Sequence, residues 1–218
     1  MARRRVAILI SGRGSNMAAL IEAAAADDYP AEIVLVVSNI AGAGGLAIAE
    51  GAGIATATIE SRPFGKDREA FERKLQETLL AHDIELVCLA GFLRLLTPWF
   101  VGQWEGRMLN IHPALLPSYR GLHTHERALA DGVKIHGATV HFVVPEMDSG
   151  PIVMQGAVAV RDDDTPDRLA ARVLDVEHRI YPDALRLVAS GQTRIENGVC
   201  RTKASGSPDD ALIAPAVI

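Results

Sequence analysis

Short apolar runs alternate with helix-like stretches through the first half of the chain. Three of the expected strands of this half, at residues 6–10, 33–37 and 86–89, are apolar throughout, as in strands buried on both faces of a sheet. A further short strand is expected at residues 55–59. Three expected helices lie between them, at residues 15–26, 46–52 and 67–81. The last helix carries its apolar side chains along one side, at Phe71, Leu75, Leu79 and Leu80. Because single helices connect the strands, the pattern predicts a doubly wound α/β fold with a mostly parallel sheet.

The pattern changes after Arg107. We expect a strand at 108–112, a short helix at 123–130, and two longer strands at 138–144 and 152–160. A tight turn at Asp148-Ser-Gly-Pro151 is expected to join the two longer strands into an antiparallel hairpin added to the sheet. A long helix at 167–189 closes the fold, and the composition of residues 203–218 predicts a loosely held tail.

Composition limits the classes of partner. The net charge of −5 gives no overall attraction to nucleic acid or to a membrane surface, so an anionic substrate requires local binding groups. The start Met1-Ala-Arg-Arg-Arg5 precedes an apolar run too short for a signal peptide, and no stretch is long enough to span a membrane. Cys88 and Cys200 provide neither a disulfide framework nor a metal-ligand spacing. These features predict a cytoplasmic protein.

The loop Ser11-Gly-Arg-Gly-Ser-Asn16 joins the first strand to the first helix. Glycines allow a ligand to approach the backbone, and free N–H groups at a helix N-terminus favour an anion. The loop does not fit a dinucleotide fingerprint, because Met17 replaces the third glycine, and it fits neither a P-loop nor a nucleophile elbow. It predicts a mononucleotide or sugar-phosphate site. The alternative is a tight turn in which Ser15 caps the helix.

Asn110, His112 and Asp148 form the second candidate site. Asn110 and His112 are two apart on an expected strand, so their side chains point the same way at its carboxyl end, where doubly wound sheets bind ligands. Pro113 ends that strand, and Asp148 lies in the turn after another strand. Each residue alone has a structural explanation. Together they supply an oxyanion stabiliser, a proton donor and a base, as acyl transfer requires.

A pair of histidines, His123 and His125, has the spacing of two metal ligands. No third ligand has suitable spacing nearby, and Thr124 is a plausible helix cap. We therefore expect no bound metal.

The motifs resemble those of the folate-dependent formyltransferases. The resemblance rests on Leu109-Asn-Ile-His-Pro-Ala-Leu-Leu-Pro117, Arg120-Gly121, His136-Gly137 and Asp148-Ser-Gly-Pro151, and it covers residues 5–190. The first loop and Gly121-Leu-His-Thr-His125 are most similar to the branch that formylates glycinamide ribonucleotide in purine (IMP) synthesis. A branch that acts on tRNA carries a further carboxyl-terminal domain and a basic surface, and a deformylase branch carries an extra amino-terminal domain. The deformylase remains the main alternative, with water as acceptor.

The resemblance implies roles for individual residues. Asn110, His112 and Asp148 would be catalytic. The substrate phosphate and ribose would be held by Arg13, Gly14, Ser15, Asn16 and Glu177. The cosubstrate 10-formyltetrahydrofolate would contact Arg68, Leu93, Arg94, Leu95, Leu96, Asn110, Val144, Pro145, Glu146, Met147 and Asp148.

The resemblance also suggests how the chain is organised. Residues 1–202 would form one formyltransferase domain, with a phosphate-binding half at 1–106 and a catalytic, folate-binding half at 107–202. A monomer or homodimer that binds only small molecules is expected. A non-catalytic nucleotide-binding module would explain the first loop, but it would leave the three polar residues without a joint role.

Overall fold

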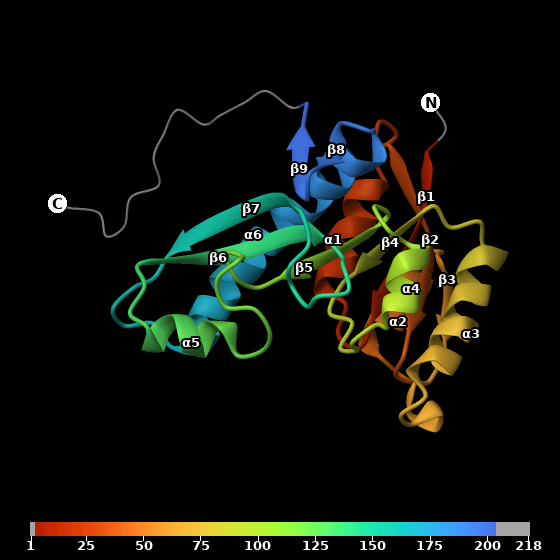
Figure 1. Cartoon of the computed structure of the whole chain (residues 1–218), viewed down its shortest axis with the longest axis horizontal. Coiled ribbons are helices and arrows are strands. Elements are labelled where there is room, and N and C mark those ends of the chain that lie inside the picture. The colour runs from red at the N-terminus through yellow and green to blue at the C-terminus, as the bar shows by residue number, and fades with distance from the viewer. Residues whose placement is uncertain (1–2, 204–218) are drawn as a thin grey trace.

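A seven-stranded sheet forms the centre of the computed structural model, which describes residues 3–203 (Figure 1). Its strands, in spatial order, are β3 (Ala55–Thr58), β2 (Ala31–Ser38), β1 (Arg4–Ile10), β4 (Leu86–Leu89), β5 (Met108–His112), β6 (Ile135–Phe142) and β7 (Ile152–Ala159). The first five run parallel, whereas β6 is antiparallel to β5 and β7 is antiparallel to β6. The expected parallel sheet with an added hairpin is therefore confirmed.

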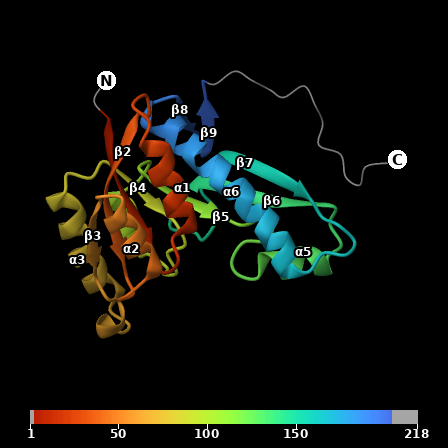
Figure 2. The ribbon, with the colours of Figure 1, turned by 180° about the vertical axis from the view of Figure 1, so that it is seen from behind.

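Helices cover both faces of this sheet, as Figures 1 and 2 show. The helices are α1 (Ser15–Ala24), α2 (Gly44–Gly51), α3 (Arg68–Ala81), α4 (Pro98–Gln103), α5 (Thr124–Ala130) and α6 (Pro166–Ala189), with a 3₁₀ turn at Arg62–Phe64. Strand β1 shows why the sheet is apolar on both sides. Its Ile8 packs into a cluster with residues of α1 and α6, and its neighbour Leu9 packs with residues of α3 and α4. Successive side chains of a strand point to opposite faces, so a central strand needs apolar residues at every position.

Several local expectations were wrong. Leu80, expected on the buried side of α3, is 59% exposed, while the other three residues of that set are buried. The connection between β6 and β7, at residues 143–151, is longer than the expected tight turn. Helix α5 begins at Thr124 with His123 at its N-cap, so Thr124 is not the cap.

Other elements were not anticipated. Helix α4 starts with Thr97 as its N-cap and Pro98 in its first turn, a strong signal that is confined to six helical residues. A separate hairpin of β8 (Thr193–Glu196) and β9 (Val199–Thr202) follows α6. Its strands are too short to show a clear alternation of apolar and polar residues.

Cys88 is a small buried residue of β4, and burial raises the pKa of its thiol to about 12. The expected tail at 203–218 lies outside the described residues except for Lys203. Of the helices described, none combines the length and the apolar character that crossing a membrane requires.

Candidate functional site

The candidate catalytic residues meet where β5 ends. Asn110 and His112 lie on β5, and Asn110 pairs in register with His141 of the antiparallel neighbour β6. Asp148 comes from the connection between β6 and β7. The structure thus brings together the three residues that the sequence indicated, at the carboxyl end of a parallel strand.

His112 has an acceptor facing each ring nitrogen. Its Nδ1 lies 3.5 Å from Asp148 Oδ2, and its Nε2 lies 2.9 Å from the carbonyl oxygen of Tyr119. The side chain is 7% exposed, so the surrounding protein screens these interactions less than bulk water would. An imidazolium carries a proton on both nitrogens, and the arrangement accommodates that charged form.

Sequence reasoning missed His141, which contacts the Asn110 amide. Asn110 Nδ2 donates to His141 Nε2 over 3.2 Å, while His141 Nδ1 donates to the carbonyl oxygen of Phe142 over 2.9 Å. Burial lowers the pKa of His141, which agrees with a neutral ring that accepts on Nε2. The Asn110 amide is therefore held in one orientation. The sequence signal was limited to the alternation in β6, which gives the face on which His141 lies, whereas the register of β6 on β5 puts His141 opposite Asn110.

The loop around Asp148 is tied back to the sheet. Asp148 has a positive φ of 52°, and its Oδ2 accepts a hydrogen bond of 2.8 Å from the backbone N–H of Gly121. A Cβ on Gly150 would lie 1.7 Å from the carbonyl oxygen of Phe142, so only glycine allows this close approach. The carboxylate is 12% exposed and also lies 3.9 Å from His141 Nε2.

The first loop leads into α1 through Gly14, which is the N-cap with a φ of 76°. No side chain caps α1, so the alternative in which Ser15 is the cap is wrong. A Cβ on Gly14 would lie 2.9 Å from the Cα of Gly45, a close backbone contact with α2 that sequence reasoning did not identify. Arg13 is exposed beside these glycines. The loop therefore presents free N–H groups and a cation together.

Asn16 and Glu177 belong to the same end of the molecule. Asn16 Nδ2 donates to Glu177 Oε2 over 2.7 Å, which joins α1 to α6 across a long sequence separation. Burial raises the pKa of Glu177, and the hydrogen bond from Asn16 opposes that shift. The Asn16 Oδ1 atom is buried without a partner. A buried acceptor without a partner is costly, which makes Asn16 a candidate for binding a ligand.

The expected folate-contacting residues form two groups. In one, Leu93 and Leu95 are exposed on a segment next to α3, and Arg68 Nη1 lies 3.5 Å from the carbonyl oxygen of Leu95. Arg94 stacks over the ring of Phe71. The other group lies in the loop that carries Asp148 and consists of Val144, Pro145, Glu146 and Met147. The 93–96 segment follows the parallel strand β4, whereas the loop that carries Asp148 follows the antiparallel strand β6 and is brought to the carboxyl end of β5 by the contacts of Asp148 with His112 and Gly121.

In the described part of the chain, His123 and His125 belong to no group of three or more potential metal ligands. His125 Nδ1 instead lies 3.2 Å from His136 Nε2. Burial, followed by the nearby His125, lowers the pKa of His136 to about 4. Burial also lowers the pKa of His125.

This histidine pair predicts that stability falls on acidification. The pKa of His136 is lower in the folded than in the unfolded chain, so the unfolded chain binds more protons between about pH 6.5 and 4. Stability is complete above that window and decreases as the pH falls through it. Between pH 7.5 and 5.5 we expect the unfolding temperature to drop by about 2–4 °C more for the wild type than for His136→Gln. Equal drops in the unfolding temperature of the two proteins would contradict the lowered pKa of His136 in the folded chain.

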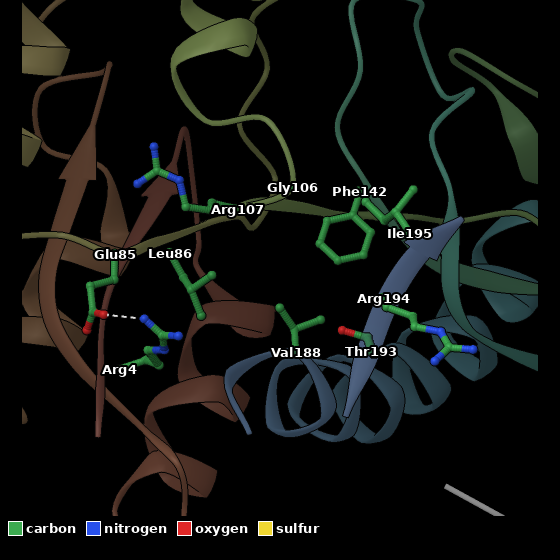
Figure 3. A pocket seen from close by; sticks show the side chains of 10 residues that line it. All are labelled: Arg4, Glu85, Leu86, Gly106, Arg107, Phe142, Val188, Thr193, Arg194 and Ile195. Carbon is green, nitrogen blue, oxygen red and sulfur yellow. Dashed lines mark hydrogen bonds and ion pairs between the residues drawn. The ribbon is translucent and has the colours of Figure 1, made fainter. Parts of the chain in front are cut away.

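A cavity of about 320 Å³ lies at the opposite edge of the sheet, between the starts of β1, β4 and β5 and the β8 strand (Figure 3). Leu86, Phe142 and Val188 line it. Arg4 pairs with Glu85 at its rim, and the guanidinium groups of Arg107 and Arg194 point away from each other. Because its polar groups do not converge, this cavity is not the candidate site.

The comparisons with known proteins agree with this geometry. The formyl transferase family matches residues 4–185, and the chain belongs to that family. It is 44% identical over 190 residues to the phosphoribosylglycinamide formyltransferase of Escherichia coli K12, which covers 87% of this chain and 89% of that protein. The solved glycinamide ribonucleotide transformylase 1 of Symbiobacterium toebii superposes with a TM-score of 0.88 at 41% identity, covering 92% of this chain and 94% of that one.

Other relatives are much longer. The trifunctional purine biosynthetic protein adenosine-3 of Bos taurus is 49% identical over 197 residues, which is 90% of this chain but 19% of that protein. The chain therefore spans about a fifth of the length of these relatives.

Proposed function

We propose that this protein transfers the formyl group of 10-formyltetrahydrofolate to the amine of glycinamide ribonucleotide, in purine biosynthesis. The products are formylglycinamide ribonucleotide and tetrahydrofolate. The observation that carries the proposal is the convergence of Asn110, His112 and Asp148 in one partly buried cluster at the carboxyl edge of the sheet. The similarity to the Escherichia coli enzyme of that name supports it.

The reaction begins when the substrate amine attacks the formyl carbon. The amide of Asn110 and the imidazolium of His112 stabilise the oxygen of the tetrahedral intermediate, where negative charge develops. Asp148 accepts the proton that the amine loses, directly or through a water. A proton from His112 or from water then reaches N10 of the folate as the C–N10 bond breaks. Binding of both substrates in one site supplies the favourable orientation.

The acceptor is what separates this proposal from the deformylase alternative. A deformylase delivers the formyl group to water, which does not require a phosphate-binding loop. Here the Gly14 loop, Asn16 and the buried Glu177 lie at the same edge of the sheet as the catalytic cluster. A non-catalytic nucleotide-binding module would explain the loop at residues 11–16, but it would give the contact between His112 and Asp148 no function.

Release of tetrahydrofolate, followed with and without glycinamide ribonucleotide, tests the proposal. Release that depends on the ribonucleotide, together with a formylated product, is the expected result. Equal release in its absence would identify a deformylase. No release under either condition would contradict both enzymatic proposals and leave the binding module.

Asn16 provides a test of the phosphate loop. Replacing Asn16 with alanine removes its bond to Glu177 and its unpartnered Oδ1 atom. We expect the KM for glycinamide ribonucleotide to rise about tenfold, with a much smaller change in the KM for the folate. Steady-state kinetics with each substrate varied in turn measures both values. An increase confined to the KM for the folate would contradict the assignment of Asn16 to the phosphate site.

The remaining features of the proposal concern organisation. We propose one catalytic domain over residues 1–202, with the phosphate-binding groups in 1–106 and the catalytic and folate-binding groups in 107–202. Its substrates are small molecules and no metal takes part. A cytoplasmic monomer or homodimer fits the reducing compartment and the negative net charge.

A further inference from the structure

Glu72 is the most deeply buried acidic side chain of α3, with 1% exposure. The other buried residues of this helix are apolar, namely Phe71, Leu75 and Leu79. Removing a carboxylate from water is unfavourable unless hydrogen bonds replace its hydration. A carboxylate in this position therefore requires specific partners, which the structure identifies.

Both oxygens of Glu72 bind Thr97. The backbone N–H of Thr97 donates to Oε1 over 2.7 Å, and the Thr97 hydroxyl donates to Oε2. Thr97 is the N-cap of α4, where its Oγ1 accepts from the N–H of Phe100 over 3.4 Å. Glu72 thus fixes the residue at which the 93–96 segment ends and α4 begins.

The 93–96 segment is held at its other end by Ser11, the first residue of the loop at residues 11–16. The N–H of Leu93 donates to Ser11 Oγ over 2.8 Å, and Ser11 Oγ in turn donates to Asn39 Oδ1 over 2.5 Å. Between these two anchors, Leu93 and Leu95 are 75% and 61% exposed. A short segment fixed at both ends can present exposed apolar side chains in one arrangement.

We infer that Glu72 is a positioning residue that holds the 93–96 segment in the conformation that binds the folate cosubstrate. The inference rests on the proposed function. A buried ionic group contributes little net stability compared with an apolar side chain of similar volume, whereas it does select one arrangement of its partners. Loss of the anchor lets the segment populate other conformations. The apparent affinity for the folate then falls in proportion to the fraction of molecules that keep the binding conformation.

The test compares Glu72→Leu with Gln76→Leu. Gln76 lies one turn further along α3 and accepts a hydrogen bond of 2.7 Å from Trp104 Nε1, at the end of α4 remote from the segment. Glu72→Leu is expected to raise the KM for 10-formyltetrahydrofolate about tenfold, with kcat and the KM for the ribonucleotide changed less than about threefold. Glu72→Gln, which retains one acceptor oxygen for the Thr97 N–H, should recover part of the loss. Gln76→Leu should leave the folate KM unchanged.

Hydrogen exchange supplies a readout that does not depend on activity. The amides of residues 93–97 should exchange faster in Glu72→Leu than in the wild type, and at the wild-type rate in Gln76→Leu. If Glu72→Leu does not fold, Thr97→Val removes the two bonds of the hydroxyl, to Glu72 and from the Phe100 N–H, but keeps the bond from the Thr97 N–H to Glu72, and it carries the same expectations with smaller effects.

The two proposals fail in different ways. An unchanged folate KM in Glu72→Leu, with amide exchange at 93–97 as in the wild type, would overturn the positioning role of Glu72. Turnover by the wild-type protein would still support the proposed formyl transfer. A wild-type protein that neither turns over nor binds tetrahydrofolate in a calorimetric titration would overturn the function and the folate role together.

Discussion

Replacing His112 with alanine is expected to lower turnover by about 100-fold or more, while the affinity for glycinamide ribonucleotide changes less than about twofold. In the proposed mechanism the imidazolium supplies positive charge near the oxygen that becomes negative in the transition state, and its two nitrogens face Asp148 and the Tyr119 carbonyl rather than the loop at residues 11–16. Its removal therefore affects the chemical step and not ribonucleotide binding. Steady-state kinetics together with calorimetric binding of the ribonucleotide separates the two quantities.

His82→Ala is a matched control for this change. His82 is the C-cap of α3, and its Nδ1 lies 2.8 Å from the carbonyl oxygen of Thr78, far in sequence from the catalytic cluster. The control variant should retain wild-type turnover. Because His112 is largely buried, the unfolding temperature of its variant must also be measured. A folded His112→Ala protein with wild-type turnover would remove His112 from the chemistry.

The centre of the sheet was predictable because three of its strands contain uninterrupted apolar runs. A parallel strand buried on both faces needs such a run, and β1, β2 and β4 all have one. The short elements were not predictable for a physical reason. Both ends of the six-residue helix α4 are held by another helix, because Glu72 binds its N-cap Thr97 and Gln76 binds its C-cap Trp104, and local sequence does not record those contacts.

In the candidate site, too, some features were predictable from the sequence and others depend on contacts between distant elements. Spacing on one strand placed Asn110 beside His112, since residues two apart share a face. It could not show that the antiparallel β6 would put His141 against the Asn110 amide, because the register between two strands depends on the whole hairpin. Likewise, the contact of Asn16 with Glu177 joins α1 to α6, and no local signal links these helices.

Replacing Asp148 with asparagine is expected to lower turnover by about 100-fold. Asparagine has nearly the same shape, and its amide oxygen can still accept the hydrogen bond from the Gly121 N–H that holds the loop. The variant loses the carboxylate 3.5 Å from His112 Nδ1, which in the proposed mechanism accepts the amine proton. The KM for both substrates should change less than about threefold, because the loop position is retained.

Asp162→Asn serves as the control, since Asp162 pairs with Lys134 on the exposed surface and should be replaced without loss of turnover. Wild-type turnover in Asp148→Asn would mean that water removes the amine proton unaided and that His112 needs no carboxylate. A large increase in the folate KM with little change in kcat would instead make Asp148 a binding residue of its loop. Loss of turnover at an unchanged unfolding temperature is the result that assigns the carboxylate to the chemical step.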